Sequence, residues 1–421
     1  MAKKLDITKQ RLTRLVKQGM TVREIQAVLG CSSSTVRRRM GEWDLELLTE
    51  PQVYHTAEPG DDTPAPEKLG STDMTEDRKT TLIPPTSAPT SAKIFFGKGL
   101  DIGTMNIVSA VQSEEGVVTS RTRDAFLDLD LDAKAKLQLG GTTFVEYEDH
   151  ILILGDDALQ LANLFKREAR RPLAQGLISA SEHDALEVLS IMIEGVLGKP
   201  QVEDEVCYYS IPASPVDAPE RDVVYHEAAF ERILEELGYT AISGNEAMAI
   251  IYAECAKETF SGIGISFGSG MVNIALSYQT LPIMEFSLAR GGDWIDAQSA
   301  QALGTTASRM CTIKEKGINL AAPVGREQEA LVVYYKSLIN YALKHIAKQF
   351  KAEQSDTELT AIPIVVSGGT SLPDGFIEVF ESVFDKKHRK RFPLEISEVR
   401  RASNPMTAVA EGLLVQARQD S

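Results

Sequence analysis

Residues 99–106 read Gly-Leu-Asp-Ile-Gly-Thr-Met-Asn, and residues 107–111 continue as Ile-Val-Ser-Ala-Val. The pattern predicts a strand that ends in an acidic residue, a turn of small residues and a second strand. Backbone N–H groups in such a turn can wrap phosphate oxygens, and the carboxylate of Asp101 can hold Mg²⁺ through water. Taken alone this pattern is weak evidence, because a GxG match is most often an ordinary turn.

Two further stretches repeat the design. Residues 264–271 read Gly-Ile-Ser-Phe-Gly-Ser-Gly-Met and lead into VNIALS, 165 residues after the first stretch (264 − 99). Two such hairpins could clamp the phosphates of a nucleotide from opposite sides. Residues 364–373, IVVSGGTSLP, predict a strand that opens into a glycine pair, where a flat purine could lie against the backbone.

The chain from Lys93 onward has the texture of an α/β protein. Apolar runs such as EVCYYSIP and AIPIVVSGG alternate with helical stretches such as ERILEELG and LVVYYKSLINYALKHIAKQF. Short β runs that end in glycine turns are typical of strands whose carboxyl ends meet a ligand. We therefore expect one α/β body over residues 93–421.

Together these elements resemble the actin and heat-shock-chaperone ATPase superfamily, most closely the bacterial actins of the MreB type. The resemblance runs from about Phe96 to Ala417, and further marks follow in the order of the family: LGDDALQLA, RRPLAQGLIS, NEAMA, ARGGDWID, TASRMCTIKE and NPMTAVAEGLL. It implies a two-lobed actin-like ATPase fold with duplicated βββαβα subdomains, which binds ATP with Mg²⁺ and assembles into filaments.

The resemblance also implies roles for individual residues. Asp101 would orient Mg²⁺ through water, and Glu246 would position or activate the water that attacks the γ-phosphate; the alternative for Glu246 is a helix-capping acid beside Asn245. The first phosphate loop would consist of Gly103, Thr104, Met105 and Asn106, and the second of Ser266, Gly268, Ser269 and Gly270. The ribose and adenosine would contact Gly291, Gly292, Asp293, Gly368, Gly369 and Thr370, with Lys314 and Glu315 at the purine edge.

One position departs from the family. Where the family begins its second phosphate loop with an aspartate, this chain has Ser266. A serine can bond to water or phosphate but supplies no negative charge to offset Mg²⁺. We therefore expect nucleotide binding to persist while hydrolysis is slow.

The charge is divided unevenly along the chain. The net charge is −16, yet residues 1–40 carry ten Lys or Arg against Asp6 and Glu24, a balance of +8, so the other residues sum to −24. A basic segment of this size can neutralise several phosphates, whereas an acidic body repels nucleic acid. The charge pattern favours a DNA-binding head on a body with another task.

Residues 1–49 predict three short helices, at 5–18, 22–29 and 33–43. The stretch GMTVREIQAVLGCSSSTVRRRM resembles the helix-turn-helix heads of resolvases and small bacterial regulators. That resemblance places Ser33, Ser34 and Arg37 at base edges of double-stranded DNA, and Lys17, Arg38 and Arg39 at phosphates. The alternative is a basic three-helix bundle that binds protein or membrane.

Residues 50–92 are rich in Pro, Thr, Ser and acids, and contain seven of the 18 prolines. No hydrophobic periodicity survives there, so we expect a disordered linker that separates head from body.

Composition excludes several classes of protein. No stretch has the roughly 18 uncharged apolar residues of a membrane-spanning helix, and Asp6 interrupts any secretory signal, so we expect a cytoplasmic protein without a transmembrane segment. The four cysteines, Cys31, Cys207, Cys255 and Cys311, show no zinc or disulfide spacing.

Two functions fit these observations best. The first is a filament-forming, ATP-binding actin-like protein that carries DNA in partition, positioning or organisation, with slow ATP hydrolysis. The alternative is a transcriptional regulator like the ROK repressors, whose actin-superfamily body senses a nucleotide or another small molecule; the Cys-rich zinc motif and the sugar-binding acids of those repressors are not found here.

Overall fold

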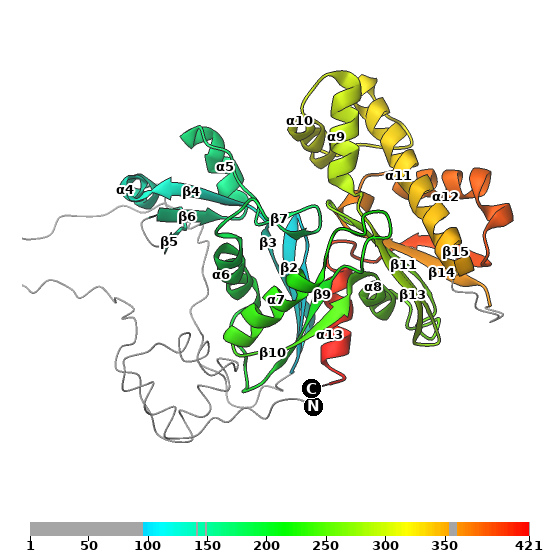
Figure 1. Ribbon diagram of the computed structural model, residues 1–421, viewed down its shortest axis with the longest axis horizontal. Helices are drawn as coiled ribbons and strands as arrows, with labels where there is room; N and C mark the ends of the chain where they lie inside the picture. The colour runs from blue at the N-terminus through cyan, green and yellow to red at the C-terminus, as the bar shows by residue number, and fades with distance from the viewer. Residues whose placement is uncertain (1–95, 140–141, 148–149, 353–359, 421) are drawn as a thin grey trace, which may run out of the picture. The chain divides into compact units, whose positions relative to one another are not determined.

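The computed structural model describes residues 96–139, 142–147, 150–352 and 360–420. The helix-turn-helix predicted for residues 1–49 and the linker predicted for residues 50–92 lie outside the described residues. The described residues between Phe96 and Asp420 form one compact unit, and this body consists of two lobes (Figure 1).

Lobe I is built on a five-stranded sheet in the order β10-β9-β1-β2-β3. β1 pairs antiparallel with β2 and parallel with β9, so a hairpin lies beside a crossover connection. The strands are β1 (Lys98–Ile102), β2 (Asn106–Ser113), β3 (Gly116–Arg123), β9 (Val206–Ile211) and β10 (Thr240–Asn245). The helices α6 (Ala185–Leu197) and α7 (Val224–Glu236) bury their apolar faces in the core of this lobe.

Lobe II is built on a second five-stranded sheet, in the order β13-β12-β11-β14-β15. Its strands are β11 (Gly262–Phe267), β12 (Val272–Tyr278), β13 (Leu281–Leu288), β14 (Ile362–Ser367) and β15 (Ile396–Arg401). β11 and β14 are buried at every residue, as expected for central strands covered on both faces. The helices α11 (Gly325–Ala352) and α12 (Phe376–Lys387) complete the core of this lobe.

The two lobes repeat one topology. Read from β15, the second sheet has the order β15-β14-β11-β12-β13, which matches β10-β9-β1-β2-β3 strand for strand. In both lobes the first strand pairs antiparallel with the second and parallel with the fourth. The predicted duplication is therefore confirmed, but each unit runs βββαβαβα, one strand and one helix longer than the predicted βββαβα. Asp101 on β1 and Ser266 on β11 occupy equivalent positions two residues before Gly103 and Gly268.

Each unit ends in a helix that packs at the junction of the lobes. α8 (Glu246–Glu254) follows the last strand of lobe I and packs on β11 and β12 of lobe II, whereas α13 (Ala408–Ala417) follows lobe II and packs on β1 and β9. Glycines allow this close approach: a Cβ on Gly99 would lie 2.1 Å from the carbonyl oxygen of Ala410, and a Cβ on Gly264 would lie 2.2 Å from that of Ala247. Where α8 crosses α13, a Cβ on Gly412 would lie 1.8 Å from the carbonyl oxygen of Ala249.

We expect Gly412→Ala to lower the free energy of unfolding by about 3 kcal/mol, because backbone atoms at the crossing of α8 and α13 must move apart. Gly195→Ala is the matched control, since a Cβ on Gly195 meets nothing within 4 Å and alanine favours the helix by about 1 kcal/mol. Urea denaturation of both variants measures the difference. A Gly412→Ala protein as stable as Gly195→Ala would contradict the close approach.

Smaller elements are inserted at the same point of each unit, after the third strand. In lobe I they are β4 (Phe126–Asp130), η1 (Leu131–Ala133), α4 (Lys134–Leu139), β5 (Val145–Tyr147), β6 (His150–Leu154), α5 (Asp156–Phe165), β7 (Leu173–Ala174) and β8 (Leu177–Ile178). In lobe II they are α9 (Gly292–Leu303) and α10 (Ala307–Glu315). The short helices η2 (Gly369–Ser371) and η3 (Arg389–Arg391) follow β14 and α12.

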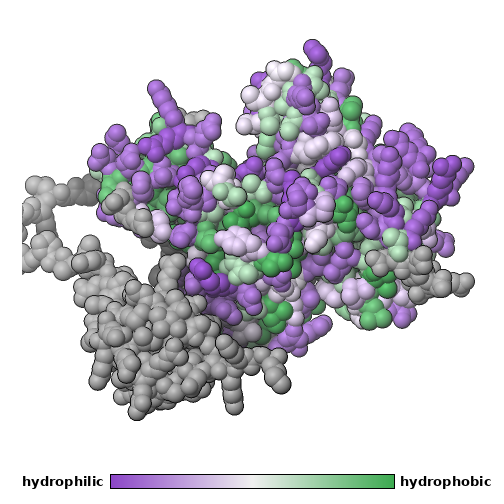
Figure 2. Space-filling model, in the orientation of Figure 1, coloured by the Kyte–Doolittle hydropathy of each residue, from purple (hydrophilic) through white to green (hydrophobic). Residues whose placement is uncertain are grey.

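The surface of the body is mostly hydrophilic on the face drawn in Figure 2. Within the part of the chain that the structure describes, none of the helices combines the length and the apolar character needed to span a bilayer.

Candidate functional site

Two equivalent turns face each other across the junction of the lobes. The turn between β1 and β2 is closed by a hydrogen bond from the N–H of Gly103 to the carbonyl of Asn106 at 3.0 Å. The turn between β11 and β12 is closed in the same way, from Gly268 to Met271 at 3.0 Å. The predicted hairpins are therefore both present, and residues of both turns line one cavity.

That space is a cavity of about 520 Å³, within the range of small-molecule and cofactor sites. Nearly all of the predicted cofactor residues line it: Asp101, Gly103, Thr104, Met105, Asn106, Glu246, Ser266, Gly268, Ser269, Gly270, Gly292, Lys314, Glu315, Gly368, Gly369 and Thr370. The structure thus brings together elements that lie up to 269 residues apart in the chain (370 − 101).

Two predicted ribose contacts do not line the cavity. Asp293 forms an ion pair with Arg171 of lobe I at 3.4 Å, and its N–H donates to the carbonyl of Ser269 at 2.9 Å. Gly291 is packed against the second turn, since a Cβ there would lie 2.4 Å from the carbonyl oxygen of Ser269. Both residues therefore contact the second turn, and their predicted approach to a ribose stays a prediction.

The two residues predicted at the purine edge line the cavity but also have protein partners. Lys314 pairs with the buried Asp296 at 2.8 Å and donates to the carbonyl of Gly292 at 3.1 Å. Glu315 pairs with Arg123, at the end of β3. The Arg123–Glu315 ion pair joins lobe I to lobe II, as does the Arg171–Asp293 pair, so the lobes are held across the cavity by opposite charges.

Of the carboxyl groups that line the cavity, those of Asp101 and Glu246 lie close enough to affect each other. Asp101 accepts a hydrogen bond from the hydroxyl of Ser210 at 3.0 Å, and Glu246 accepts one from the side-chain amide of Asn273 at 2.6 Å. Burial raises the pKa of Asp101 to about 6. Burial, together with the nearby Asp101 carboxylate, raises the pKa of Glu246 to about 8, against the hydrogen bonds from Asn273 and Ser266. In both groups burial therefore disfavours the charged form of the carboxyl group.

Glu246 is placed by the start of α8. Asn245 is the N-cap: its side-chain oxygen accepts from the N–H groups of Ala247 at 2.9 Å and Met248 at 3.1 Å. Capping by Asn245 leaves the carboxyl group of Glu246 available to the cavity, so Glu246 is not the capping acid.

The glycine pair predicted within residues 364–373 follows β14 and forms one wall of the cavity. Gly368 has φ of +87°, and a Cβ there would lie 2.5 Å from the carbonyl oxygen of Phe267, so glycine is required on two grounds. The hydroxyl of Thr370 donates to the carbonyl of Gly268 at 2.9 Å, which ties this wall to the second turn. Pro405 and Met406 line the cavity beside it.

A third loop meets the two turns. The hairpin of β7 and β8 turns at Gln175 and Gly176, and a Cβ on Gly270 would lie 2.2 Å from the nitrogen of Gly176 and 2.8 Å from the hydroxyl of Thr104. Two loops of lobe I therefore converge on Gly270 of lobe II. This hairpin belongs to the RRPLAQGLIS stretch. The sequence alone did not indicate that this stretch takes part in the site.

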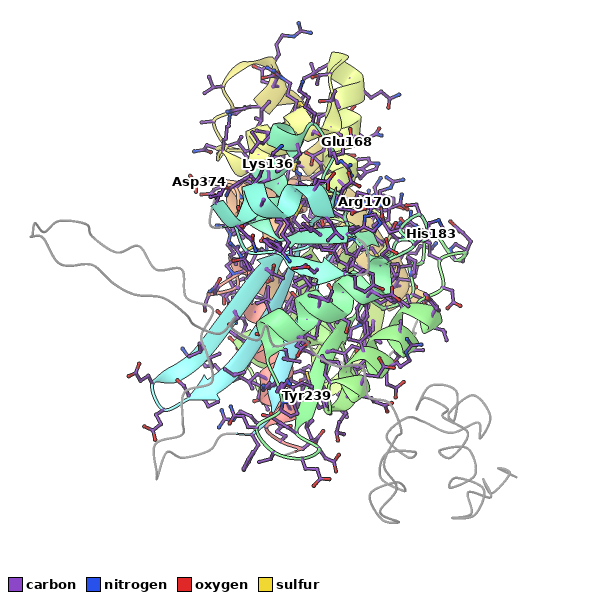
Figure 3. The ribbon with its side chains drawn as sticks, turned by 90° about the vertical axis from the view of Figure 1, so that its left-hand side faces the viewer. Lys136, Glu168, Arg170, His183, Tyr239 and Asp374 are labelled. Atoms are coloured by element: carbon purple, nitrogen blue, oxygen red, sulfur yellow. The ribbon has the colours of Figure 1, made fainter. Side chains whose placement is uncertain are left out.

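Sequence reasoning also missed several lining residues: Arg121, Arg123, Asn273, Cys311, Asp374 and Met406. The two arginines could have been found from the sequence pattern, because residues 121 and 123 of one strand lie on the same face of the sheet. Asn273 lies opposite Ser266 on the paired strand, which only the register of β11 and β12 reveals. Figure 3 labels Asp374, which lies above Tyr239 in that view.

The residues present fit a magnesium ion bound with a nucleotide. Mg²⁺ keeps several waters and is held by one or two carboxylates plus substrate phosphates, and Asp101 supplies one such carboxylate. Within the described ranges no cluster of three or more His, Cys, Asp or Glu side chains could hold a metal ion by itself. A metal here would therefore depend on the phosphates of a bound ligand.

A comparison with protein-family models decides the family. The model called Volactin matches residues 96–417. The chain belongs to the Volactin family. A search of curated proteins finds no significant match to this volactin chain.

Solved structures show the fold of the volactin body. The MamK double helical filament has a TM-score of 0.58 at 18% identity, covering 76% of this chain and 98% of that chain. MreB5 of Spiroplasma citri bound to AMPPNP has a TM-score of 0.52 at 15% identity, covering 76% and 95%, and its ADP-bound form has 0.52 at 16% identity, covering 77% and 97%. The predicted two-lobed actin-like fold is therefore confirmed.

Near the site, Asp124 offers a test of pH dependence. The residue is fully buried, its Oδ2 accepts from the N–H of Leu173 at 3.2 Å, and burial raises its pKa to about 8. The folded state therefore holds this proton more tightly than the unfolded state between about pH 4 and pH 8, and the free energy of unfolding falls as the pH rises through that window.

We expect Asp124→Asn to be more stable than the parent by on the order of 2 kcal/mol at pH 8, with the difference shrinking to nothing near pH 4. Asp132→Asn, at an exposed position, is the control and should change little at either pH. Denaturant titrations at several pH values measure the effect. A difference that grows toward acid pH would contradict the raised pKa.

Proposed function

We propose that this volactin binds ATP with Mg²⁺ in the cavity between its lobes, assembles into filaments in the cytoplasm and carries DNA through residues 1–49. The observation that carries the nucleotide site is the pair of equivalent turns, closed by Gly103 and Gly268, that face one cavity from opposite lobes. Two sets of backbone amides opposed in this way suit a chain of phosphates.

The roles within the site follow from the placement of the residues. The turns at 103–106 and 268–270 would donate N–H groups to the β- and γ-phosphates, and Gly368, Gly369 and Thr370 would lie against the adenosine. Asp101 would hold the magnesium ion through water, and the ion supplies positive charge that offsets the phosphates. Glu246, a carboxylate at the same cavity, would orient the attacking water and accept its proton.

Assembly and DNA binding rest on separate supports. MamK, which shares the fold, has been solved as a double helical filament, and an actin-like chain that repeats one heterologous contact builds an open polymer. DNA binding rests on the +8 charge of residues 1–40 and on the resemblance of this segment to helix-turn-helix heads.

Three measurements on the full chain test the proposal. Titration calorimetry with ATP, with and without Mg²⁺, should show saturable binding that the metal strengthens. Negative-stain microscopy with ATP should show filaments, and a labelled duplex should bind with a steep salt dependence. Absence of ATP binding would exclude the proposed nucleotide site, and absence of polymer would exclude the proposed filament. Absence of duplex binding at low salt would exclude the proposed DNA-binding head.

Ser266 provides a further prediction. It is buried, occupies the position equivalent to Asp101 and bonds to Glu246. We expect Ser266→Asp to hydrolyse ATP about tenfold faster than the parent, because a second carboxylate adds negative charge beside Mg²⁺. Single-turnover phosphate release at saturating Mg²⁺ measures it, with Ser266→Asn as the uncharged control. A Ser266→Asp protein slower than the parent would show that the serine itself serves the reaction.

A further inference from the structure

An exposed basic surface covers the end of α12 and the short helix η3. Residues 386–391 read Lys-Lys-His-Arg-Lys-Arg, six basic side chains in a row. This run stands out because residues 41–421 together carry a net charge of −24. Within this run Arg389 pairs with Asp385 at 2.6 Å. The other exposed cations are Lys386, Lys387, Lys390 and Arg391, and they form no ion pair with any residue that the structure describes. Hydrophilic residues cover this side of the molecule in Figure 2.

The basic surface continues onto α11, which packs beside α12 (Figure 1). The ring of His388 contacts the side-chain oxygen of Asn340 on α11 at 3.1 Å. Burial, with the nearby Lys344 and Lys387, lowers the pKa of His388, so lysines from both helices reach the same point. Lys344 and Lys348 follow Asn340 at intervals of four residues and are exposed on the same face of α11.

An acidic surface lies on the other lobe, along α7. Glu231 and Glu235 are exposed and four residues apart, so they share a face of this helix. Burial, with the like charges of Glu231 and Glu236, raises the pKa of Glu235, which shows that these carboxylates crowd one another. Figure 3 labels Tyr239, which closely follows the end of α7 at the lower end of lobe I.

The two helices also match in the spacing of an apolar side chain and a charge. Val224 on α7 is 65% exposed and lies 11 residues before Glu235; Val333 on α11 is 60% exposed and lies 11 residues before Lys344. Eleven residues make about three turns and rise about 16 Å, so in each helix the valine and the charge share one face at the same separation. A parallel alignment would place valine against valine and Glu235 against Lys344.

We propose that the basic surface of one copy, on α11 and α12, docks on the acidic face of α7 in a second copy. The contact joins two different surfaces on opposite lobes. A row of copies therefore keeps a free basic surface at one end and a free acidic surface at the other, so the contact can repeat without closing. Opposite charges at one end of the two helices set the alignment, and the valines add an apolar contact about three turns away. The inference deepens the proposed assembly and rests on it.

Charge reversal on the full chain tests the contact. One variant carries Lys344→Glu with Lys387→Glu, a second carries Glu231→Lys with Glu235→Lys, and a third carries all four changes. A control reverses two exposed lysines elsewhere, Lys136→Glu with Lys257→Glu. The critical concentration is measured by sedimentation with ATP and Mg²⁺ at two salt concentrations, and filament width by microscopy.

We expect each two-residue reversal to raise the critical concentration about tenfold or to narrow the filaments. A 1:1 mixture of the two reversed proteins should assemble like the parent, because one now has two acidic surfaces and the other two basic ones. The fourfold variant should also recover, and high salt should weaken the parent.

Several outcomes would overturn the contact. Reversed variants that assemble like the parent, a mixture without recovery, or a control as damaged as the reversals each exclude it while leaving the proposed assembly intact. A basic-surface variant that assembles normally but loses binding of a labelled duplex would make the surface a DNA site instead. A parent that forms no polymer removes both the assembly and this contact.

Discussion

Glu246→Gln should retain ATP binding while its ATP hydrolysis falls at least about 100-fold below the rate of the parent. Glutamine keeps the size of the side chain and can still bond to Asn273, but it cannot accept a proton from the attacking water. Because Asn245 caps α8, the substitution leaves the start of that helix intact. The effect should therefore be confined to the chemical step.

Single-turnover phosphate release and ATP titration of the same protein separate the two effects. Asn245→Ala is an informative comparison, because it removes the cap that places Glu246 and should lower stability and hydrolysis together. If Glu246→Gln hydrolyses ATP as fast as the parent, the carboxylate has no part in positioning or activating water. Loss of ATP binding in the same variant would instead show that Glu246 is needed to bind the nucleotide.

Gly270→Ala should weaken ATP binding at least about 100-fold. An added Cβ would lie 2.2 Å from the nitrogen of Gly176 and 2.8 Å from the hydroxyl of Thr104, so the hairpin of β7 and β8 and the first turn must both move away from the second turn. These loops form the walls around the proposed phosphate position. A movement of about 1 Å is enough to lose most of the hydrogen bonds to a phosphate.

Gly195→Ala is the control for this prediction. Gly195 is not among the residues that line the cavity, and a Cβ there meets nothing within 4 Å. Calorimetry should give little change for Gly195→Ala and a large one for Gly270→Ala, and circular dichroism should show that both proteins fold. Equal affinities in the two variants would mean that the convergence at Gly270 does not shape the nucleotide site.

Much of the fold could be predicted from local sequence. The hairpins around Gly103 and Gly268 could be predicted because a strand, a turn of small residues and a second strand are contiguous, and their hydrogen bonds form between near neighbours. The long helix α11 could be predicted because its buried residues recur with the period of a helix. The family resemblance then supplied the order of the lobes.

The pairing of charges could not be predicted in this way. Arg123 and Glu315 are 192 residues apart, and Arg171 and Asp293 are 122 apart. Nothing near Asp293 in the chain indicates that it will pair with lobe I. The same holds for Lys314, whose partner Asp296 becomes buried only when α9 and α10 pack together.

The sequence by itself determined the elements, the candidate residues of the cavity and the departure at Ser266, because each of these depends on residue type and short-range spacing. The tertiary structure decided which of those residues face a common space, which are occupied by a protein partner and how far burial raises the pKa of Asp101 and Glu246. The physical reason is that burial and charge pairing depend on what lies across the space between elements, and the packing of distant segments sets that distance.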